Sequence, residues 1–365
     1  MKKIKSVGGF HSIKYTLSML FTLGFFKLIK AMLRKNTCKT CALGMGGQKG
    51  GMTNELGNFP ELCKKTLQAM KSDMKGAIPN KVFKSTSIEE FAKLSSRELD
   101  GLGRIPYPLF AKVGDTHFSK ISYQEAFNKV TEKMKMTAPN KSFFYFSGRS
   151  SNEAGFLLQI LARVFGTNHV NNCSYYCHQA SGVGLSQTIG SGTATLKLDD
   201  VENTDLFFLI GGNPTSNHPR LLTTLMKIKS KGAKVIIINP VKEPGLVNFK
   251  VPSNLKSLFF GTKIADEYIQ PHIGGDMALI NGMLKYLIDN NFIDTGFITN
   301  FTEDFDKLKS YLASLDWKDI EQDSGVSKPE IVHIAKIYAE SKNAVFSWTM
   351  GLTHHKNGVD NIKSI

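Results

Sequence analysis

Two neighbouring side chains, Cys177 and His178, could carry out chemistry in this chain of 365 residues. A cysteine thiolate is both a nucleophile and a soft metal ligand, and a histidine can accept a proton. In a hydrolase Cys177 would be the nucleophile and His178 the base, but side chains adjacent in sequence seldom face each other well enough for proton transfer. Two other interpretations remain open: Cys177 binds a soft metal, or it is a buried, unreactive cysteine beside a hydrogen-bonded histidine.

Three further cysteines near the start have a spacing typical of a metal site. Cys38 and Cys41 place two thiolates three residues apart, and Cys63 can supply a third from a nearby turn. Three ligands are one fewer than a zinc ion or a cubane iron–sulfur cluster needs. We expect a metal site, with a reduced pair without metal and a zinc site completed elsewhere as alternatives. Five cysteines in all are odd in number and do not form a secreted disulfide framework, so we expect reduced cysteines in the cytoplasm.

Three loops could bind a nucleotide. They lie at residues 211–214 and 239–240, each directly after an apolar run, and at 274–276. Glycines let backbone N–H groups approach a pyrophosphate, and the helix starts that follow supply positive dipole ends. Asn239 would contact a ribose or base, and Asp276 could accept hydrogen bonds from a guanine edge. The fingerprints of ordinary NAD and ATP sites are missing, and the alternative is that these loops are simple turns and caps.

These residues must be positioned by an α/β scaffold. The apolar runs 206–210 and 235–238 are unbroken, which is typical of parallel strands buried on both faces. Helices alternate with strands at a spacing that predicts a doubly wound sheet, in which ligands bind at the carboxyl ends of the strands. Near the start, a helix capped by Ser87 with Glu90 is expected over 84–104. The other expected strands are 142–146 and 344–347, and the other expected helices begin at Glu61 or cover 122–134, 152–165, 218–231, 276–289, 303–315 and 328–341.

Charge and hydropathy bear on the partners. Lys and Arg total 46 against 31 Asp and Glu, a net charge of +15, which favours anionic partners. Because the lysines are scattered and no nucleic-acid-binding motif is present, we expect a solvated lysine-rich surface and no nucleic acid partner. Residues 17–33 are apolar but contain Lys27 and Lys30, so we expect an amphipathic helix packed on the protein, with no stable membrane insertion. The expected location is cytoplasmic.

Five stretches, taken together, resemble the molybdopterin oxidoreductase family, and most closely its formate-dehydrogenase-related, YdeP-type branch. The order and spacing of the matches hold from about residue 105 to the last residue. The set is therefore specific, although no single stretch is. The stretches are 147–185, 200–220, 232–240, 273–283 and 347–362.

The resemblance implies an amino-terminal iron–sulfur region followed by doubly wound α/β domains around a molybdenum bis(molybdopterin guanine dinucleotide) cofactor. Family chains are around double the length of this one, so we expect an incomplete amino-terminal part. The implied regions are 1–105 with the amino-terminal helix and the cysteines, 106–172 as the first part of an α/β cofactor-binding domain, 173–343 as a second, dinucleotide-binding α/β domain, and 344–365 as the start of the return to the first domain.

The resemblance also implies roles for single residues. Cys177 matches the ligand of the molybdenum, which a soft, low-pKa thiolate suits, and His178 matches the adjacent proton acceptor. Cys38 and Cys41 match the first two ligands of a [4Fe–4S] cluster, with Cys63 as a third, whereas formate dehydrogenases carry four cysteines there. The residues implied to bind the dinucleotides or line the cofactor are Gly212, Asn213, Pro214, Ser216, His218, Asn239, Gly275, Asp276, Met350, Gly351, Thr353 and His354.

The implied reaction is a two-electron oxidation or reduction of a small-molecule substrate at molybdenum. Electrons would pass singly through the iron–sulfur cluster to an electron-transfer protein, and the protein would hold and tune the cofactor. A carboxyl-terminal half-chain is a further expected partner. The alternative, from another class, is a non-catalytic protein that binds a nucleotide or pterin on the same α/β scaffold.

Overall fold

The computed structural model describes residues 7–35, 43, 50–61, 63–148 and 150–365. Two of the expected cluster ligands, Cys38 and Cys41, lie outside the described residues. The described chain has a mixed α/β fold, built from both helices and strands.

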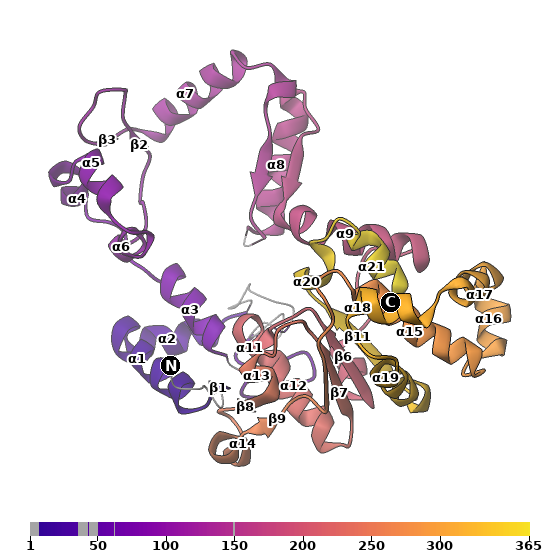
Figure 1. Cartoon of the computed structure of the whole chain (residues 1–365). Coiled ribbons are helices and arrows are strands. Elements are labelled where there is room, and N and C mark those ends of the chain that lie inside the picture. The colour runs from indigo at the N-terminus through magenta and orange to yellow at the C-terminus, as the bar shows by residue number, and fades with distance from the viewer. Residues whose placement is uncertain (1–6, 36–42, 44–49, 62, 149) are drawn as a thin grey trace.

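A four-stranded parallel sheet forms the centre of the lobe that contains α12, α15 and α19 (Figure 1). The order of its strands is β10-β7-β6-β11, and each neighbouring pair runs parallel. This confirms the strands expected at 206–210, 235–238 and 344–347. The remaining strand was not expected, because three residues are too few to give a clear hydropathy pattern. The strands are β6 (Leu206–Ile210), β7 (Lys234–Ile238), β10 (Glu267–Ile269) and β11 (Ala344–Trp348).

Separate hydrophobic cores bury the two faces of this sheet. Phe208 belongs to the core under α15 (Asp276–Asp289) and α19 (Lys328–Glu340). Its neighbour Phe207 belongs to the opposite core, under α12 (Pro219–Ser230). Because successive residues of a strand point to opposite faces, a strand covered on both sides has to be apolar throughout.

Shorter helices complete the lobe around the sheet. The helix expected over 303–315 begins at Phe305, after Asp304, whose φ of 62° is not helical. The helices are α10 (Leu198–Glu202), α11 (Pro214–Asn217), α13 (Pro244–Val247), α14 (Leu255–Phe260), α16 (Thr295–Phe301), α17 (Phe305–Ser314), α18 (Trp317–Ser324), α20 (Met350–Thr353) and α21 (Gly358–Ser364).

A βαβ unit stands away from the main sheet (Figure 1). Strands β4 (Phe144–Phe146) and β5 (Val170–Asn172) pair in parallel, and α8 (Asn152–Phe165) connects them. Strand β5 runs directly into α9 (Cys173–Thr188), which carries Cys177 back toward the main sheet. The elements before this unit are β2 (Leu109–Phe110), β3 (Ser119–Lys120), α7 (Tyr123–Lys135) and the 3-10 turn η1 (Pro139–Lys141).

The expectation of one helix over 84–104 is wrong. Three short helices occupy this part of the chain: α4 (Asn80–Ser85), α5 (Ile88–Lys93) and α6 (Ser96–Leu102). Ser87 and Glu90 form the expected capping box, but Ser95 and Glu98 form a second one. An N-cap residue has extended backbone angles, so the helix that begins at Ser87 cannot continue through Ser95.

The amino-terminal segment packs as a separate small cluster. Helices α1 (Phe10–Leu23) and α2 (Phe25–Met32) meet at Gly24 and cover α3 (Lys64–Asp73), which begins after Cys63 rather than at Glu61 as expected. Strand β1 (Val7–Gly8) ties this segment to the main lobe by parallel pairing with β8 (Asn248–Lys250), whose other neighbour is β9 (Thr262–Lys263).

Candidate functional site

The carboxyl ends of the four parallel strands lie at one edge of the sheet. Each strand is followed there by a loop that contains residues expected to bind the cofactor. The loops contact one another: Asn239 donates to the carbonyl of Gly212 at 3.3 Å, and Thr349 donates to the carbonyl of Gly211 at 2.5 Å. The residues gathered at this edge are Gly212, Asn213 and Pro214 after β6, Asn239 after β7, Gly275 and Asp276 after β10, and Met350 and Gly351 after β11.

Glycines set how closely two of these loops approach. Gly211 has a φ of 64°, a conformation that side chains disfavour, and its backbone lies against Gly351. A Cβ atom on Gly351 would overlap the carbonyl oxygen of Gly211, and one on Gly212 would lie 2.6 Å from a methyl group of Thr349. The β6 and β11 loops can therefore pack backbone to backbone only with glycine at these positions.

Helix α9 brings Cys177 to the same edge. Asn172 caps the helix by accepting a hydrogen bond from Ser174 N at 3.0 Å. Helical geometry breaks at His178, where φ is −134°. Cys177 Sγ lies 3.0 Å from Met350 Sδ, and the Thr353 hydroxyl donates to the Cys177 carbonyl at 3.0 Å. The two expected catalytic residues are thus brought together with the loop that follows β11.

Protonation at this site follows from burial. Burial raises the pKa of the Cys177 thiol, and the neighbouring Cys173 raises it further. Burial lowers the pKa of His178, and His354 adds to this by charge repulsion. Both groups are therefore neutral at pH 7 in the metal-free protein. A bound cation would be needed to convert this thiol to a thiolate.

This geometry also bears on the hydrolase interpretation. Among the described residues, the hydrogen-bond contact of Cys177 Sγ is with Met350 Sδ and not with the His178 ring. A cysteine nucleophile needs a base within hydrogen-bond reach. The arrangement favours metal binding by Cys177 over nucleophilic catalysis.

Asp276 offers a buried acceptor at the carboxyl edge. It is the first residue of α15 and is 7% exposed. Burial raises the pKa of its carboxyl group, while the nearby His355 lowers it. The start of a helix favours a negative charge, so this carboxylate is placed to accept hydrogen bonds from a ligand.

Asn239 and Asn213 are engaged within the protein. The Asn239 side chain also accepts a hydrogen bond from Val241 N at 2.9 Å, so this amide ties the loops together. Ser216 lies on α11, and His218, half-buried at the start of α12, has its pKa lowered by burial. The Thr215 hydroxyl donates to the Asn213 side chain.

Sequence reasoning did not single out Cys173 or His355. Cys173 precedes Cys177 by four residues on α9, a spacing that places both on one helix face, and its Sγ accepts a hydrogen bond from Gly148 N at 3.1 Å. His355 bonds the carbonyl of Gly351 at 2.7 Å. The helical spacing could have revealed Cys173, but nothing in the sequence places His355 near Asp276.

Of the amino-terminal cysteines, Cys63 is described. It caps α3, and its Sγ accepts from Thr66 N at 3.4 Å. Cys63 lines a cavity of about 620 Å³ together with Thr215, next to the loop after β6. No group of three His, Cys, Asp or Glu side chains within the described ranges is arranged to hold a metal ion.

Comparisons with known proteins are consistent with this architecture. A family model described as molybdopterin oxidoreductase matches residues 104–365. Protein YdeP of Escherichia coli strain K12 is 36% identical over 296 residues, which are 78% of this chain and 39% of YdeP. An uncharacterized oxidoreductase of Mycobacterium tuberculosis strain H37Rv is 33% identical over 314 residues, 84% of this chain and 40% of the relative.

Two further proteins extend the comparison. The alpha subunit of F420-dependent formate dehydrogenase 1 of Methanococcus maripaludis is 32% identical over 262 residues, 72% of this chain and 36% of the subunit. The solved structure of acetylene hydratase from Pelobacter acetylenicus is similar in fold, with a TM-score of 0.57 and 21% identity over 72% of this chain and 34% of the hydratase. The chain spans about two fifths of the length of the curated relatives that it matches.

Proposed function

The chain belongs to the molybdopterin oxidoreductase family, and from this membership we propose that it is part of a formate-dehydrogenase-like enzyme. The family implies a molybdenum–pterin cofactor and an oxidoreductase. We propose further that the cofactor is the bis(molybdopterin guanine dinucleotide) form and that electrons pass through a [4Fe–4S] cluster. The reaction would be a two-electron oxidation or reduction of a small molecule in the cytoplasm.

The observation that carries this proposal is the gathering of Cys177 with the loops of the carboxyl edge. A soft thiol lies against Met350, and glycines let the backbones of the β6 and β11 loops pack against each other at Gly211 and Gly351. Asp276 supplies a buried acceptor for a guanine edge. A soft ligand, closely packed glycine loops at the carboxyl ends of parallel strands and a buried acceptor fit a metal-bearing guanine dinucleotide.

Each residue would have a separate task. Cys177 would bind the metal as a thiolate, losing the proton that its burial favours in the free protein. His178, neutral at pH 7, would accept a proton from the substrate at its imidazole nitrogen. Thr353 holds the Cys177 carbonyl, which fixes the start of the α9 break. When bound, the metal centre supplies the two-electron redox chemistry itself.

We assign the iron–sulfur cluster to Cys38, Cys41 and Cys63, with a fourth ligand of another type. Support comes from the shared cavity of Cys63 and Thr215, which brings the third cysteine to the loop after β6. A cluster held there would lie beside the cofactor and could relay single electrons to an electron-transfer protein.

A carboxyl-terminal polypeptide is the second partner in this proposal. The βαβ unit has only two strands, which are marginal on their own. Large apolar side chains of α7 and α8 are exposed, among them Tyr123, Phe127, Phe156, Leu157 and Val164. Because the matched relatives are much longer, we propose that a polypeptide corresponding to their remaining length covers these faces.

The test is to co-express the chain with the part of YdeP that follows the matched region, anaerobically and with added molybdate. Metal analysis should find molybdenum, and acid hydrolysis should release twice as much GMP as molybdenum. Iron should copurify and should fall when Cys38 and Cys41 are changed to serine. If the assembled protein contains neither molybdenum nor pterin, the proposal is wrong.

A non-catalytic nucleotide-binding protein is the second candidate. It is favoured by the protonated state of Cys177 in the metal-free protein and by the buried carboxyl group of Asp276 at the carboxyl edge of the sheet. Binding of guanine nucleotide without molybdenum or iron, by the chain alone and by the assembled protein, would support it. Loss of that binding in Asp276→Asn with unchanged folding would locate the nucleotide.

A further inference from the structure

Helices α1 and α2 present large apolar side chains to solvent. Phe21 is 90% exposed and Phe26 is 85% exposed, and Leu17, Phe25 and Leu33 are each at least half exposed. Scattered apolar residues are normal on a protein surface, but four on two consecutive helices and a fifth directly after them form a patch. These five side chains make up the apolar face of the helix pair.

The opposite side of the pair is firmly packed. Met19, Leu28 and Met32 are at most 5% exposed and contact Leu67 and Met70 of α3. The apolar face is therefore held in place by a core of its own. Its exposure does not arise from a loose helix.

The bend between the helices bears on how they could meet a membrane. Neither helix, nor any other single one within the described ranges, has the length and apolar character to cross a bilayer, although α1 and α2 pass that test as a pair bent by 112°. The pair turns at Gly24, which has a φ of 81°. Straightening it into a span would break the packing of Met19 and Leu28 on α3, so this geometry suits a helix pair that lies on a surface.

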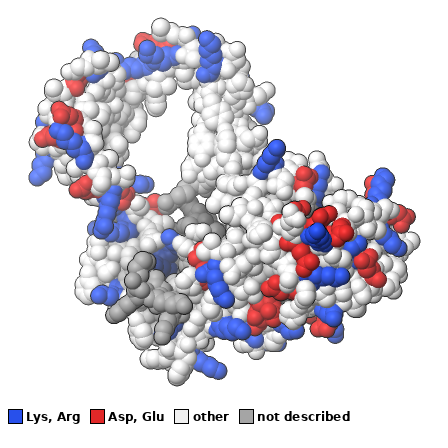
Figure 2. All heavy atoms as spheres, in the orientation of Figure 1, with Lys and Arg blue, Asp and Glu red and all other residues white. Residues whose placement is uncertain are grey.

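The net positive charge of the chain is concentrated in the same amino-terminal part of the sequence. Ten of the 46 Lys and Arg residues lie within residues 1–54, which contain no Asp or Glu. The remaining residues have 36 Lys and Arg against 31 Asp and Glu, so two thirds of the net charge of +15 comes from the first 54 positions. Figure 2 shows acidic and basic side chains intermingled over the lobe of α15 to α19, in contrast to the composition of α1 and α2.

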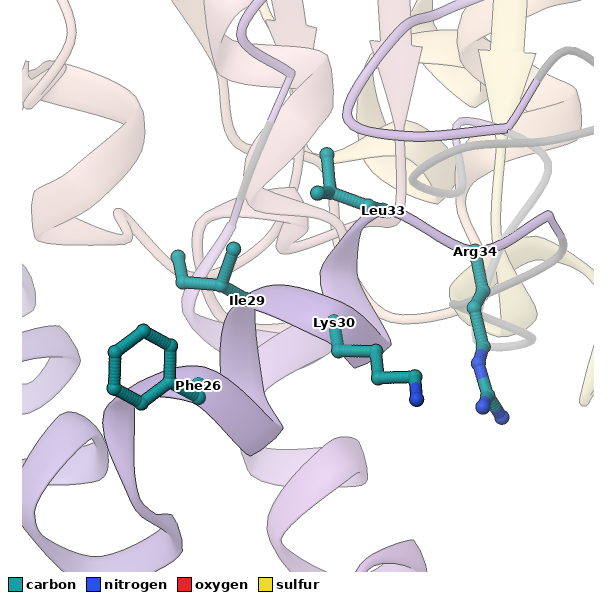
Figure 3. Close-up of a pocket in the computed structure, with 5 residues that line it drawn as sticks. All are labelled: Phe26, Ile29, Lys30, Leu33 and Arg34. Carbon is teal, nitrogen blue, oxygen red and sulfur yellow. The ribbon is translucent and has the colours of Figure 1, made fainter.

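A groove joins the two kinds of side chain. Phe26, Ile29 and Leu33 of α2 and the following turn line a groove of about 560 Å³ with Lys30 and Arg34. In Figure 3 the side chains of Lys30 and Arg34 extend downward, whereas those of Ile29 and Leu33 point upward. These two kinds of side chain suit a lipid. Its acyl chain can contact the apolar side chains while its anionic headgroup contacts the cationic nitrogens.

We propose that this helix pair binds the surface of an anionic lipid bilayer, with the apolar face in the boundary between headgroups and acyl chains. Lys14, Lys27 and Lys30, all exposed, face the anionic headgroups. A second copy of the chain is a poorer occupant, because two such faces would bring together basic segments that contain no acid. Binding is peripheral and reversible, since the pair stays packed on α3.

Vesicle sedimentation with the full chain tests this. We expect partition onto vesicles of phosphatidylcholine with phosphatidylglycerol, weaker partition onto phosphatidylcholine alone, and loss of binding at high salt. Phe21→Ser with Phe26→Ser should lower the partition coefficient about tenfold or more. Lys27→Glu with Lys30→Glu should lower it similarly on anionic vesicles only.

Matched variants elsewhere control for general effects. Phe297→Ser with Phe301→Ser removes two exposed rings of α16, and Lys133→Glu with Lys135→Glu makes the same charge change on α7. Neither double variant should change partition. An equal loss of partition in the control variants would overturn the proposal. So would unchanged partition of the Phe21 and Phe26 double variant.

A second measurement keeps the test independent of folding defects in the serine variants. Phe26→Trp should show a blue-shifted emission on anionic vesicles, with quenching by bromine near the headgroup end of the acyl chains. An unchanged spectrum contradicts the proposal. If the unmodified chain self-associates but does not bind vesicles, and the Phe21 and Phe26 double variant does not self-associate, the apolar face binds a second copy of the chain and the proposal is wrong.

Discussion

Cys177 Sγ and Met350 Sδ lie 3.0 Å apart, although 173 positions separate these residues in the chain. The contact joins the break in α9 to the loop after β11, and the Thr353 hydroxyl reinforces it through the Cys177 carbonyl. Two soft sulfur atoms therefore meet where the loops of the parallel sheet converge. Substitutions at this edge should have separable effects on metal binding and on folding.

Replacing Cys177 by serine should remove the soft ligand while preserving the fold. In the protein assembled with a carboxyl-terminal partner, Cys177→Ser should abolish redox turnover and lower molybdenum content, because a hydroxyl is a hard and poorly ionised ligand. Guanine-nucleotide binding should stay unchanged. Cys173→Ser is the matched control, and we expect it to retain the metal. Full turnover in Cys177→Ser would contradict the assigned role.

Reactivity of Cys177 toward iodoacetamide should depend on pH in a defined direction. Burial and Cys173 raise the pKa of the Cys177 thiol, so its thiolate is scarcer than that of a free cysteine at neutral pH. In the metal-free chain we expect slower alkylation at pH 7 than in the same peptide after unfolding. The rate should still rise at pH values where the unfolded thiol has reached its plateau. Peptide mass spectrometry measures both, and equal profiles would refute the shift.

The glycine contact between the β6 and β11 loops should not tolerate a methyl group. Gly351→Ala should lower the free energy of unfolding by about 1–3 kcal/mol, because its Cβ would overlap the carbonyl of Gly211. Chemical denaturation measures the change. Gly101→Ala is the control: a Cβ there meets nothing within 4 Å, and alanine in α6 should stabilise by about 0.5 kcal/mol. Similar effects of the two substitutions would contradict the close packing.

A buried ion pair joins the segment before α3 to the main lobe. Glu61 accepts from Arg220 at 2.9 Å, and both side chains are less than 10% exposed. Two of the Arg220 nitrogens, Nε and Nη1, have no hydrogen-bond partner among the described residues. Glu61→Ala should therefore cost about 3 kcal/mol of unfolding free energy, since it leaves a buried guanidinium without its carboxylate.

The control for the ion pair is an exposed one. Glu89→Ala removes a surface pair with Lys93 and should change the unfolding free energy by no more than about 0.5 kcal/mol. Changing both buried partners, Glu61→Leu with Arg220→Met, should restore part of the loss. A double variant less stable than Glu61→Ala would contradict the conclusion that the unpaired guanidinium of Arg220 causes the loss of stability.

The sequence alone predicted the elements whose signals are local. Unbroken apolar runs identified β6 and β7, because a strand covered on both faces needs apolar residues at every position. Ser87 with Glu90 identified a helix start, because the capping box is made within four residues. The motif order also indicated the family, since it depends on residue identities along the chain.

Only the tertiary structure decided properties that depend on distant contacts. The sequence could not show that the Cys177 thiol lies against Met350 or that burial raises its pKa in the metal-free protein, because burial is a property of the packed chain. The expected packing of residues 17–33 on the protein is confirmed, but the segment forms two helices that bend at Gly24 and leave Phe21 and Phe26 exposed. Hydropathy identifies the apolar residues of a helix. Which of its faces is buried depends on the other elements of the chain that pack against it.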